Sequence, residues 1–164
     1  MTRPPKAPKA PPAFTGHNPF SGLDQIVGFH LRMAQGAVYR HFTDTFSDLG
    51  LTQKQVSVLW LISQNAGIAQ ADLGRMLQID RATMMAIVNR LQERGLVVRD
   101  RSAVDGRRQT LTLTPTGKSR LAEARLAIQA HEEWLKSRFT AGEIAILVEL
   151  LRRIHGQDTA PPKA

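Results

Sequence analysis

Apolar residues recur at helical spacing along most of the chain, and this pattern predicts a mainly helical protein. The first helix is expected from about Leu23 to Leu49, where apolar side chains fall on one broad stripe. Thr52, with Gln55 three residues later, makes a capping box that opens a second helix. That helix is apolar almost all round and is therefore expected to be buried.

A short helix, a tight turn and a capped helix are expected next. The short helix covers residues 70–77, and the turn follows at 78–79. Asp80 is a good N-cap for a further helix over 81–94. Two helices joined by so short a turn predict a helix-turn-helix.

A β-hairpin is expected directly after the capped helix. Segments 96–100 and 109–113 alternate and are rich in β-branched residues, which is typical of strands. Asp105-Gly106 between them is a hairpin-turn signal. A hairpin in this position is a wing, so the order of elements predicts a winged helix-turn-helix.

Two more helices are expected towards the C-terminus. Thr114 followed by Pro115 predicts the start of a long helix that reaches about Arg138. Thr140 with Glu143 is a second capping box and opens the last helix. That helix carries apolar residues at helical spacing, and the start of the first helix adds three more: Ile144, Leu147, Val148, Leu151, Ile154, Phe20, Leu23 and Ile26. These residues predict a dimer interface, and the alternative is that they close the core of a monomer.

Composition narrows the functions that this fold could serve. The chain has 164 residues, a formal net charge of +8 and a pI of about 10.8, a balance that suits a polyanionic partner. The absence of cysteine excludes disulfides, thiol catalysis and cysteine-bound zinc. No apolar run is long enough for a membrane span and the N-terminus lacks an apolar signal core, so a cytoplasmic protein is expected.

The fold class is thus expected to be mainly α with a small β-hairpin wing, a winged helix-turn-helix with long N- and C-terminal dimerisation helices. The domain is expected over residues 20–156, with a DNA-binding core at about 52–114. The flanking segments are dimerisation helices at about 20–49 and 115–156, a basic proline-rich arm at 1–19 and a tail at 157–164.

The capped helix has one apolar face and an opposite face whose centre is small. Small side chains permit close approach to a base edge, where asparagine and arginine can form hydrogen bonds. The expected contacts are Asn89 and Arg90 to bases, Met85 and Ala86 to thymine methyl groups, and Arg81 and Thr83 to phosphates. An ordinary solvated helix face is the alternative.

The hairpin loop is rich in arginine. Arg107 is expected to enter the minor groove, with Asp105 orienting it through a charge-assisted bond. Arg108 is a reserve or a phosphate ligand, and Arg99 and Arg101 lie on the same short ribbon. The alternative is an ordinary charged turn.

Residues 23–156 resemble the MarR family of bacterial regulators. The matching motifs are Leu91-x-x-x-Gly95-Leu96-Val97-x-Arg99, Asp105-x-Arg107 and Leu113-Thr114-x-x-Gly117, in that order. The resemblance implies a homodimer on a pseudo-palindromic double-stranded operator, with recognition helices in successive major grooves and wings in flanking minor grooves. It also implies repression relieved by a small effector, often an aromatic acid.

Two positions depart from the family pattern. Ala86 stands where many members have arginine or another polar residue, and Ala69 where serine or threonine often caps the short helix. Two other functions stay open: a winged-helix module for protein or RNA contact, and a DNA-binding activator without ligand control.

An effector pocket is expected on the first helix. His30 and His41 lie about three turns apart and so point the same way, with alanines leaving space between them. An imidazole or Arg40 would hold an aromatic carboxylate or an aromatic acyl-coenzyme A. The full candidate set is His30, Ala34, Ala37, Tyr39, Arg40, His41 and Trp60. The alternative is that the histidines are satisfied core residues or dimer contacts.

Catalysis is not expected. His131-Glu132-Glu133 superficially resembles a zinc-protease motif, but Leu135 stands where the second histidine is needed. No catalytic residue, metal ligand or cofactor is therefore expected. His17, His131 and His155 are expected to be ordinary surface or tail residues.

Overall fold

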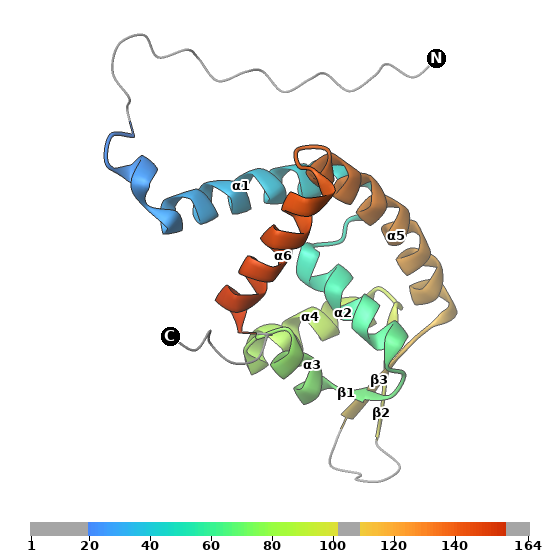
Figure 1. Ribbon diagram of the computed structural model, residues 1–164. Coiled ribbons are helices and arrows are strands. Elements are labelled where there is room, and N and C mark those ends of the chain that lie inside the picture. The colour runs from blue at the N-terminus through green and yellow to red at the C-terminus, as the bar shows by residue number, and fades with distance from the viewer. Residues whose placement is uncertain (1–19, 102–108, 157–164) are drawn as a thin grey trace, which may run out of the picture. The chain divides into compact units, whose positions relative to one another are not determined.

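The computed structural model describes residues 20–101 and 109–156, and the chain divides into two compact units, residues 1–37 and 38–164 (Figure 1). The described part of the first unit is helical, and the second combines helices with a small three-stranded antiparallel sheet. This architecture confirms the expected fold class. No helix in the described part of the chain is both long and apolar enough to cross a membrane.

The first long helix is broken where the sequence predicts continuity. The observed pieces are η1 (Leu23–Gln25), α1 (Val27–Thr45) and η2 (Ser47–Leu49). Ile26 separates the first two with extended backbone angles, φ −96° and ψ 112°. Between the last two, Phe46 turns into the core, where it is 2% exposed and stacks on Phe42. A continuous helix is therefore a wrong expectation at this end, because burying Phe46 outweighs helical continuity.

The helices of the second unit begin where their capping residues predict. The further elements are α2 (Gln53–Gln64), β1 (Ile68–Ala69), α3 (Gln70–Met76), α4 (Arg81–Glu93), β2 (Val97–Arg101), β3 (Gln109–Leu113), α5 (Pro115–Lys136) and α6 (Ala141–His155). Thr52, Asp80, Thr114 and Thr140 each accept a hydrogen bond from the backbone N–H three residues on. These four caps are confirmed, and so is the lack of a side-chain cap at Ala69.

The sheet has the strand order β1-β3-β2 and is antiparallel throughout. β2 and β3 pair from Val97 opposite Leu113 to Arg101 opposite Gln109, which confirms the hairpin. β1 pairs with β3 as a third strand, with Ile68 opposite Leu111. The sequence does not predict β1, because two residues are too few to show an alternating pattern.

The core lies between α2, α4, the sheet and the first half of α5. Its most buried large side chains are Phe46, Leu59, Ile62, Leu73, Met84, Leu91 and Leu111. α2 is less completely buried than expected, because Trp60 is 37% exposed. The guanidinium carbon of Arg125 on α5 lies 4.7 Å from the centroid of the Trp60 ring, so a cation covers part of this aromatic face.

The end of α4, the hairpin and the start of α5 meet at one crowded point. The Leu96 carbonyl accepts a hydrogen bond from the Thr114 N–H over 3.1 Å. The Thr114 hydroxyl donates to the Gly95 carbonyl over 2.6 Å. A Cβ atom at Gly117 would stand 1.9 Å from the Leu96 carbonyl oxygen, so only glycine fits there. The wing is thus held to α5 by backbone contact.

Gly117→Ala is expected to lower the free energy of unfolding by about 3 kcal/mol or more, because the methyl group forces two backbones apart. Gly142→Ala on α6 is the matched control, since its Cβ would meet nothing within 4 Å. Alanine at this helical site is expected to be neutral or stabilising by up to about 1 kcal/mol. Urea unfolding at one fixed protein concentration compares them. Wild-type stability in Gly117→Ala would refute the steric argument.

Two histidines form a pair inside the second unit. Nδ1 of His41 on α1 and Nδ1 of His131 on α5 lie 2.8 Å apart. One Nδ1 therefore carries a hydrogen and the other accepts it. The His41 ring stacks on Trp134 at 3.9 Å between ring centroids, and His131 is only 7% exposed. The expectation that His131 is an ordinary surface residue is wrong, because its partner lies on a different helix, far away in the sequence.

The surroundings of the pair disfavour protonation. Burial lowers the pKa of both rings. The positive charge of Arg138 lowers the pKa of His41 further, and the neighbouring His41 does the same for His131. Asp44 and Glu132 act in the opposite direction but do not reverse the shift.

Stability is expected to fall as the pH drops below the ordinary histidine pKa of 6.5. The unfolded chain takes up protons there that the folded pair binds less readily, so acid favours unfolding, whereas above this pH the contribution is complete. His131→Gln and His41→Asn should each flatten this dependence between about pH 7 and pH 5. Unfolding midpoints across this range test the expectation, which fails if both variants keep the wild-type slope.

Candidate nucleic-acid interface

The turn between α3 and α4 brings two backbone segments close together. Gln78 has a φ of 52°, a left-handed conformation that is uncommon for a residue other than glycine. The Ile79 N–H donates to the Gly74 carbonyl over 2.9 Å. The Gln78 side chain donates from Nε2 to the His155 carbonyl at the end of α6, 2.8 Å away. α3 and α4 thus form the helix-turn-helix that the sequence predicts, and α6 ends beside its turn.

α4 presents the face that was expected to contact DNA. Its buried residues are Met84, Ile87, Val88 and Leu91, which face the core. Arg81, Met85, Ala86, Asn89 and Arg90 are exposed on the other side, and Met85 is 50% exposed. Thr83 is half-buried, and its backbone N–H donates to the Asp80 carboxylate over 2.9 Å. The structure therefore gathers the predicted contact residues of α4 at one exposed surface.

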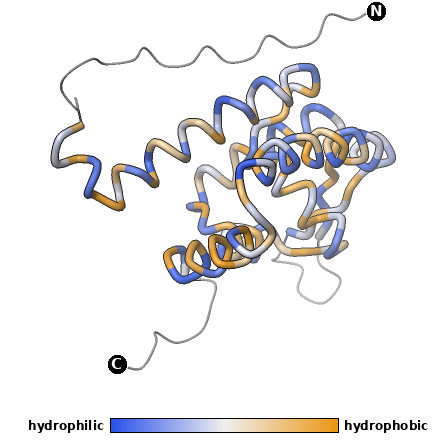
Figure 2. The backbone as a smooth tube through the Cα atoms, turned by 45° about the horizontal axis from the view of Figure 1, so that its top comes forward, coloured by the Kyte–Doolittle hydropathy of each residue, from blue (hydrophilic) through white to orange (hydrophobic). Residues whose placement is uncertain are grey.

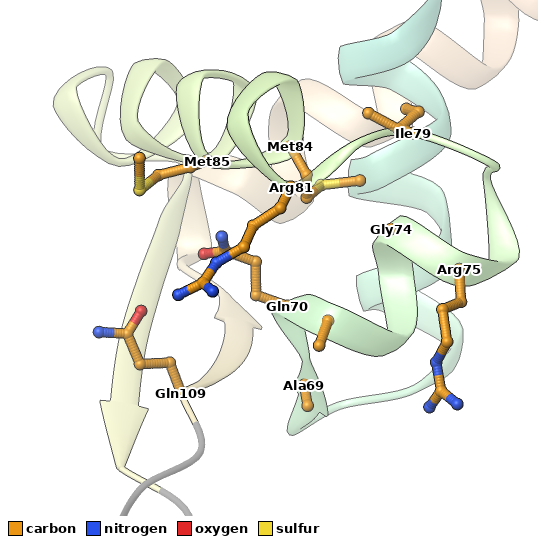
Figure 3. Close-up of a pocket in the computed structure, with 10 residues that line it drawn as sticks. Ala69, Gln70, Gly74, Arg75, Ile79, Arg81, Met84, Met85 and Gln109 are labelled. Carbon is orange, nitrogen blue, oxygen red and sulfur yellow. The ribbon is translucent and has the colours of Figure 1, made fainter.

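A hollow of about 650 Å³ lies beside this surface, between α3, the start of α4 and β3. Figure 3 shows Arg81 reaching into it from the first turn of α4, with the Gln70 side chain turned towards Arg81 and Arg75 pointing away. Gln109 of β3 lines the same hollow. Gln70 Oε1 is buried without a hydrogen-bond partner in the described part of the chain.

Gln70 and Gln109 are polar residues at this surface that the sequence reading missed. Each is the first residue of its element, Gln70 of α3 and Gln109 of β3. Only their position, next to the helix-turn-helix and the arginine-rich loop, distinguishes them in the sequence. The hollow is lined by two cations, Arg75 and Arg81, together with amide groups, a set that can contact a phosphate group.

The start of α4 also carries a fixed negative charge. Hydrogen bonds from the Thr83 side chain and backbone lower the pKa of Asp80. The ionised carboxylate caps the helix and stands at its positive end, where an anion is stabilised. Arg81 follows directly, so a phosphate group near this end meets a cation and an anion side by side.

The sequence predicts that Arg99 projects from the wing with the other arginines, but the structure places it elsewhere. It sits in the middle of β2, opposite Leu111, and is half-buried. Its Nη2 donates to Asn89 Oδ1 over 2.6 Å. Grouping Arg99 with the projecting cations of the ribbon is therefore wrong, because its side chain folds back onto the recognition helix.

Arg94, just past the end of α4, links this helix to the end of η2. Its Nη1 donates to the Gly50 carbonyl over 2.7 Å, and its Nη2 donates to the Leu49 carbonyl over 3.1 Å. These carbonyls terminate a helical turn, where arginine is a favourable partner. The sequence does not predict this role for Arg94, because its partners Leu49 and Gly50 lie 45 and 44 residues away along the chain.

The wing residues Asp105, Arg107 and Arg108 lie outside the described residues. Their proposed roles in the minor groove therefore stay predictions. In the described part of the chain, no group of three or more acidic or histidine side chains could hold a metal ion.

The candidate effector residues fall in both units. His30, Ala34 and Ala37 belong to the first, where His30 Nε2 lies 2.8 Å from the Asp24 carbonyl oxygen. In the second, Tyr39 and Arg40 are exposed. The ring contacts of His41 are with His131 and Trp134, and the Trp60 ring lies against Arg125. His41 is thus packed against side chains, and the role of this set in ligand binding stays a prediction.

Comparison with known proteins identifies relatives over most of the chain. A model of the MarR family matches residues 49–108. The putative transcriptional regulatory protein for the hcr operon of Thauera aromatica is 36% identical over 137 residues, which cover 83% of this chain and 82% of that protein.

Solved structures agree with this relationship. The transcriptional repressor CouR bound to a 23-mer DNA duplex superimposes with a TM-score of 0.81 at 31% identity, covering 85% of this chain and 99% of that one. CouR has also been solved bound to p-coumaroyl-CoA, with a TM-score of 0.75 at 31% identity over 81% of this chain and 94% of that one. The PcaV regulator of Streptomyces coelicolor, in complex with its natural ligand, has a TM-score of 0.75 at 28% identity, covering 82% of this chain and 94% of that one.

These relatives are transcriptional regulators, and the solved structures among them share the fold of this chain. Two of the motifs noted in the sequence lie in the described residues, one from the end of α4 into β2 and the other from the end of β3 into α5. The chain is not an enzyme but a DNA-binding transcriptional regulator, and it belongs to the MarR family.

Proposed function

We propose that this protein binds a pseudo-palindromic DNA operator as a homodimer and represses transcription until an aromatic acid or its coenzyme A thioester releases it. The observation that carries the proposal is the exposed face of α4, where small and apolar side chains stand between arginines. The likeness of this chain to a repressor solved on a DNA duplex supports the same conclusion.

The chemistry of α4 suits a major groove. Arg81 and Arg90 are exposed on this face, with Met85 and Ala86 between them. Arginine binds guanine edges or phosphates, while a methionine or alanine side chain can contact a thymine methyl group. The short side chain of Ala86 lets the helix approach the base edges closely.

The second copy of the chain would cover α6. α6 has no buried residue in the single chain, although its mean composition is apolar, and Figure 2 shows hydrophobic segments recurring along it. Its most exposed large residues are Ile146, Val148, Leu150, Leu151 and Ile154. In the first unit, Phe20, Leu23 and Ile26 are also exposed. Exposed apolar side chains along one helix mark protein interfaces, and a two-fold dimer doubles the DNA site.

Selection from a random-sequence DNA duplex library is expected to recover a pseudo-palindrome with half-sites about 10 base pairs apart. Sedimentation of the complex should then give two chains per duplex. A monomer at micromolar concentration would contradict the dimer. Retention of RNA or DNA regardless of sequence would instead favour a winged-helix module for other contacts.

Arg81→Ala tests whether α4 contacts DNA phosphates. It is expected to weaken binding to selected and unrelated duplexes alike and to reduce the salt dependence by about one unit of slope, because a phosphate contact is lost. Arg75→Ala removes the other arginine that lines the hollow, which already pairs with Asp72 and points away from Arg81 in Figure 3, and it should leave the slope unchanged. An unchanged slope in Arg81→Ala would remove this residue from the interface.

The proposed effector is an aromatic carboxylate, free or as its thioester. The similar proteins solved with p-coumaroyl-CoA and with a natural ligand support ligand control. On this chain the exposed Tyr39 and Arg40 of α1 offer a phenol and a guanidinium, which suit a ring and a carboxylate or phosphate. His41 and Trp60 remain in the proposed set. His30, Ala34 and Ala37 belong to the first unit, and their part in ligand binding stays a prediction.

Thermal shift against p-coumarate, 4-hydroxybenzoate and p-coumaroyl-CoA is expected to find one stabilising compound that also releases the selected duplex. Saturation at about 100 times Kd should add roughly 2.7 kcal/mol. Arg40→Gln should weaken the compound about tenfold and leave DNA affinity intact. Lys54→Gln, at another exposed cation, makes the same charge change and should have no effect. Equal responses of both variants would exclude Arg40 from the site.

A further inference from the structure

We propose that Arg99 positions Asn89 so that its side chain acts on DNA as a hydrogen-bond donor alone. The recognition helix would then favour guanine, or the O4 atom of thymine, over adenine at the base pair that Asn89 faces. This inference rests on the proposed function, because it requires α4 to lie in a major groove.

The orientation of the Asn89 amide follows from the chemistry of its partner. Arg99 Nη2 lies 2.6 Å from the atom assigned as Asn89 Oδ1. A guanidinium has only donors, so the amide atom facing it must be the oxygen. Exchanging oxygen and nitrogen would set two N–H groups against each other. The Nδ2 group therefore points away from Arg99.

Arg99 is itself held firmly in place. It lies at the centre of β2, where its backbone pairs with Leu111 of β3, and its side chain is half-buried. Its Nε is buried without a hydrogen-bond partner in the described part of the chain. Such an orphaned donor is unfavourable, so the charge-assisted bond from Nη2 to Asn89 offsets part of the cost of burying this cation. Arg99 is therefore bound to Asn89 before DNA arrives.

The consequence concerns what Asn89 can recognise. Asparagine reads adenine by accepting from N6 and donating to N7 at once. Here the oxygen already accepts a charged donor, and an adenine amino group would have to approach beside the Arg99 guanidinium. Asn89 is exposed as a residue, and no described residue accepts a hydrogen bond from its Nδ2 group. This group can donate to both acceptors of guanine, O6 and N7, or to thymine O4, whereas adenine offers it only N7.

The neighbouring side chains reinforce this preference. Arg81 and Arg90 also carry only donors, and Met85 and Ala86 have no polar side-chain atom. Among these residues and Asn89, the one side-chain acceptor is Asn89 Oδ1, which is already bonded to Arg99. Such a face matches the base edges that present acceptors in the major groove, above all guanine.

The test compares base preferences after selection from a random-sequence duplex library. Asn89→Asp keeps an acceptor for Arg99, as an ion pair, and removes both donors of the amide. The wild type is expected to select guanine or thymine at one symmetry-related position in each half-site. Asn89→Asp should lose that preference, bind the wild-type sequence about tenfold more weakly, and keep its preferences elsewhere. Gln92→Glu, also exposed on α4, makes the same charge change and serves as control.

Arg99→Met supplies the complementary arm, because it keeps an unbranched side chain of similar length without donors. Freeing the Asn89 oxygen should extend the preference at that position to adenine, with thermal stability followed to confirm folding. An A·T pair in the wild-type selection that binds more weakly when its adenine is replaced by 7-deazaadenine, or an unchanged preference in Asn89→Asp, would overturn the inference and leave the proposed function standing. A wild type that enriches no sequence would overturn both.

Discussion

The close approach of Gly117 to the Leu96 backbone is the constraint on which the position of α4 and of its exposed face depends. Leu96 stands between the end of α4 and the start of β2, and its carbonyl binds Thr114 at the end of β3. With no Cβ at Gly117, α5 can start directly against this point. The recognition helix, the wing and the long helix therefore share one anchor made of backbone atoms. Side-chain substitutions elsewhere can tune this arrangement, but they cannot replace it.

Two arginine side chains near this anchor link α4 to other parts of the fold. Arg94 joins the end of α4 to the carbonyls of Leu49 and Gly50. Arg99 joins the wing strand to Asn89 on the exposed face. Two of the arginines that look like DNA ligands in a basic sequence are thus used inside the protein. Net charge alone overstates the number of cations available to a polyanion, because guanidinium groups also satisfy carbonyl and amide oxygens.

The sequence predicts the local features well, since these depend on residues a few positions apart. The caps at Thr52, Asp80, Thr114 and Thr140 and the strand pair of the wing all follow from short-range chemistry. The errors concern contacts between distant segments. The His41–His131 pair, the inward turn of Phe46 and the two-residue strand β1 each need a partner that local spacing does not reveal.

The candidate site follows the same division. Helical periodicity correctly separates the buried face of α4 from its exposed face, because that separation is a property of the helix itself. What each exposed residue can still offer is decided by the rest of the fold. Asn89 is the clear case, because its availability as an acceptor is set by Arg99 from the next strand. Gln70 and Gln109 join the surface only through the packing of α3 against the sheet.

The single hydrogen bond between Gln78 and the last turn of α6 has a mechanical consequence. A bond of this kind contributes about 1 kcal/mol, little more than thermal energy, so it opens and closes often. It links the helix-turn-helix to the C-terminal helix weakly and does not fix the position of one relative to the other. A small tilt of α6 can therefore change the angle of the turn without unfolding either element.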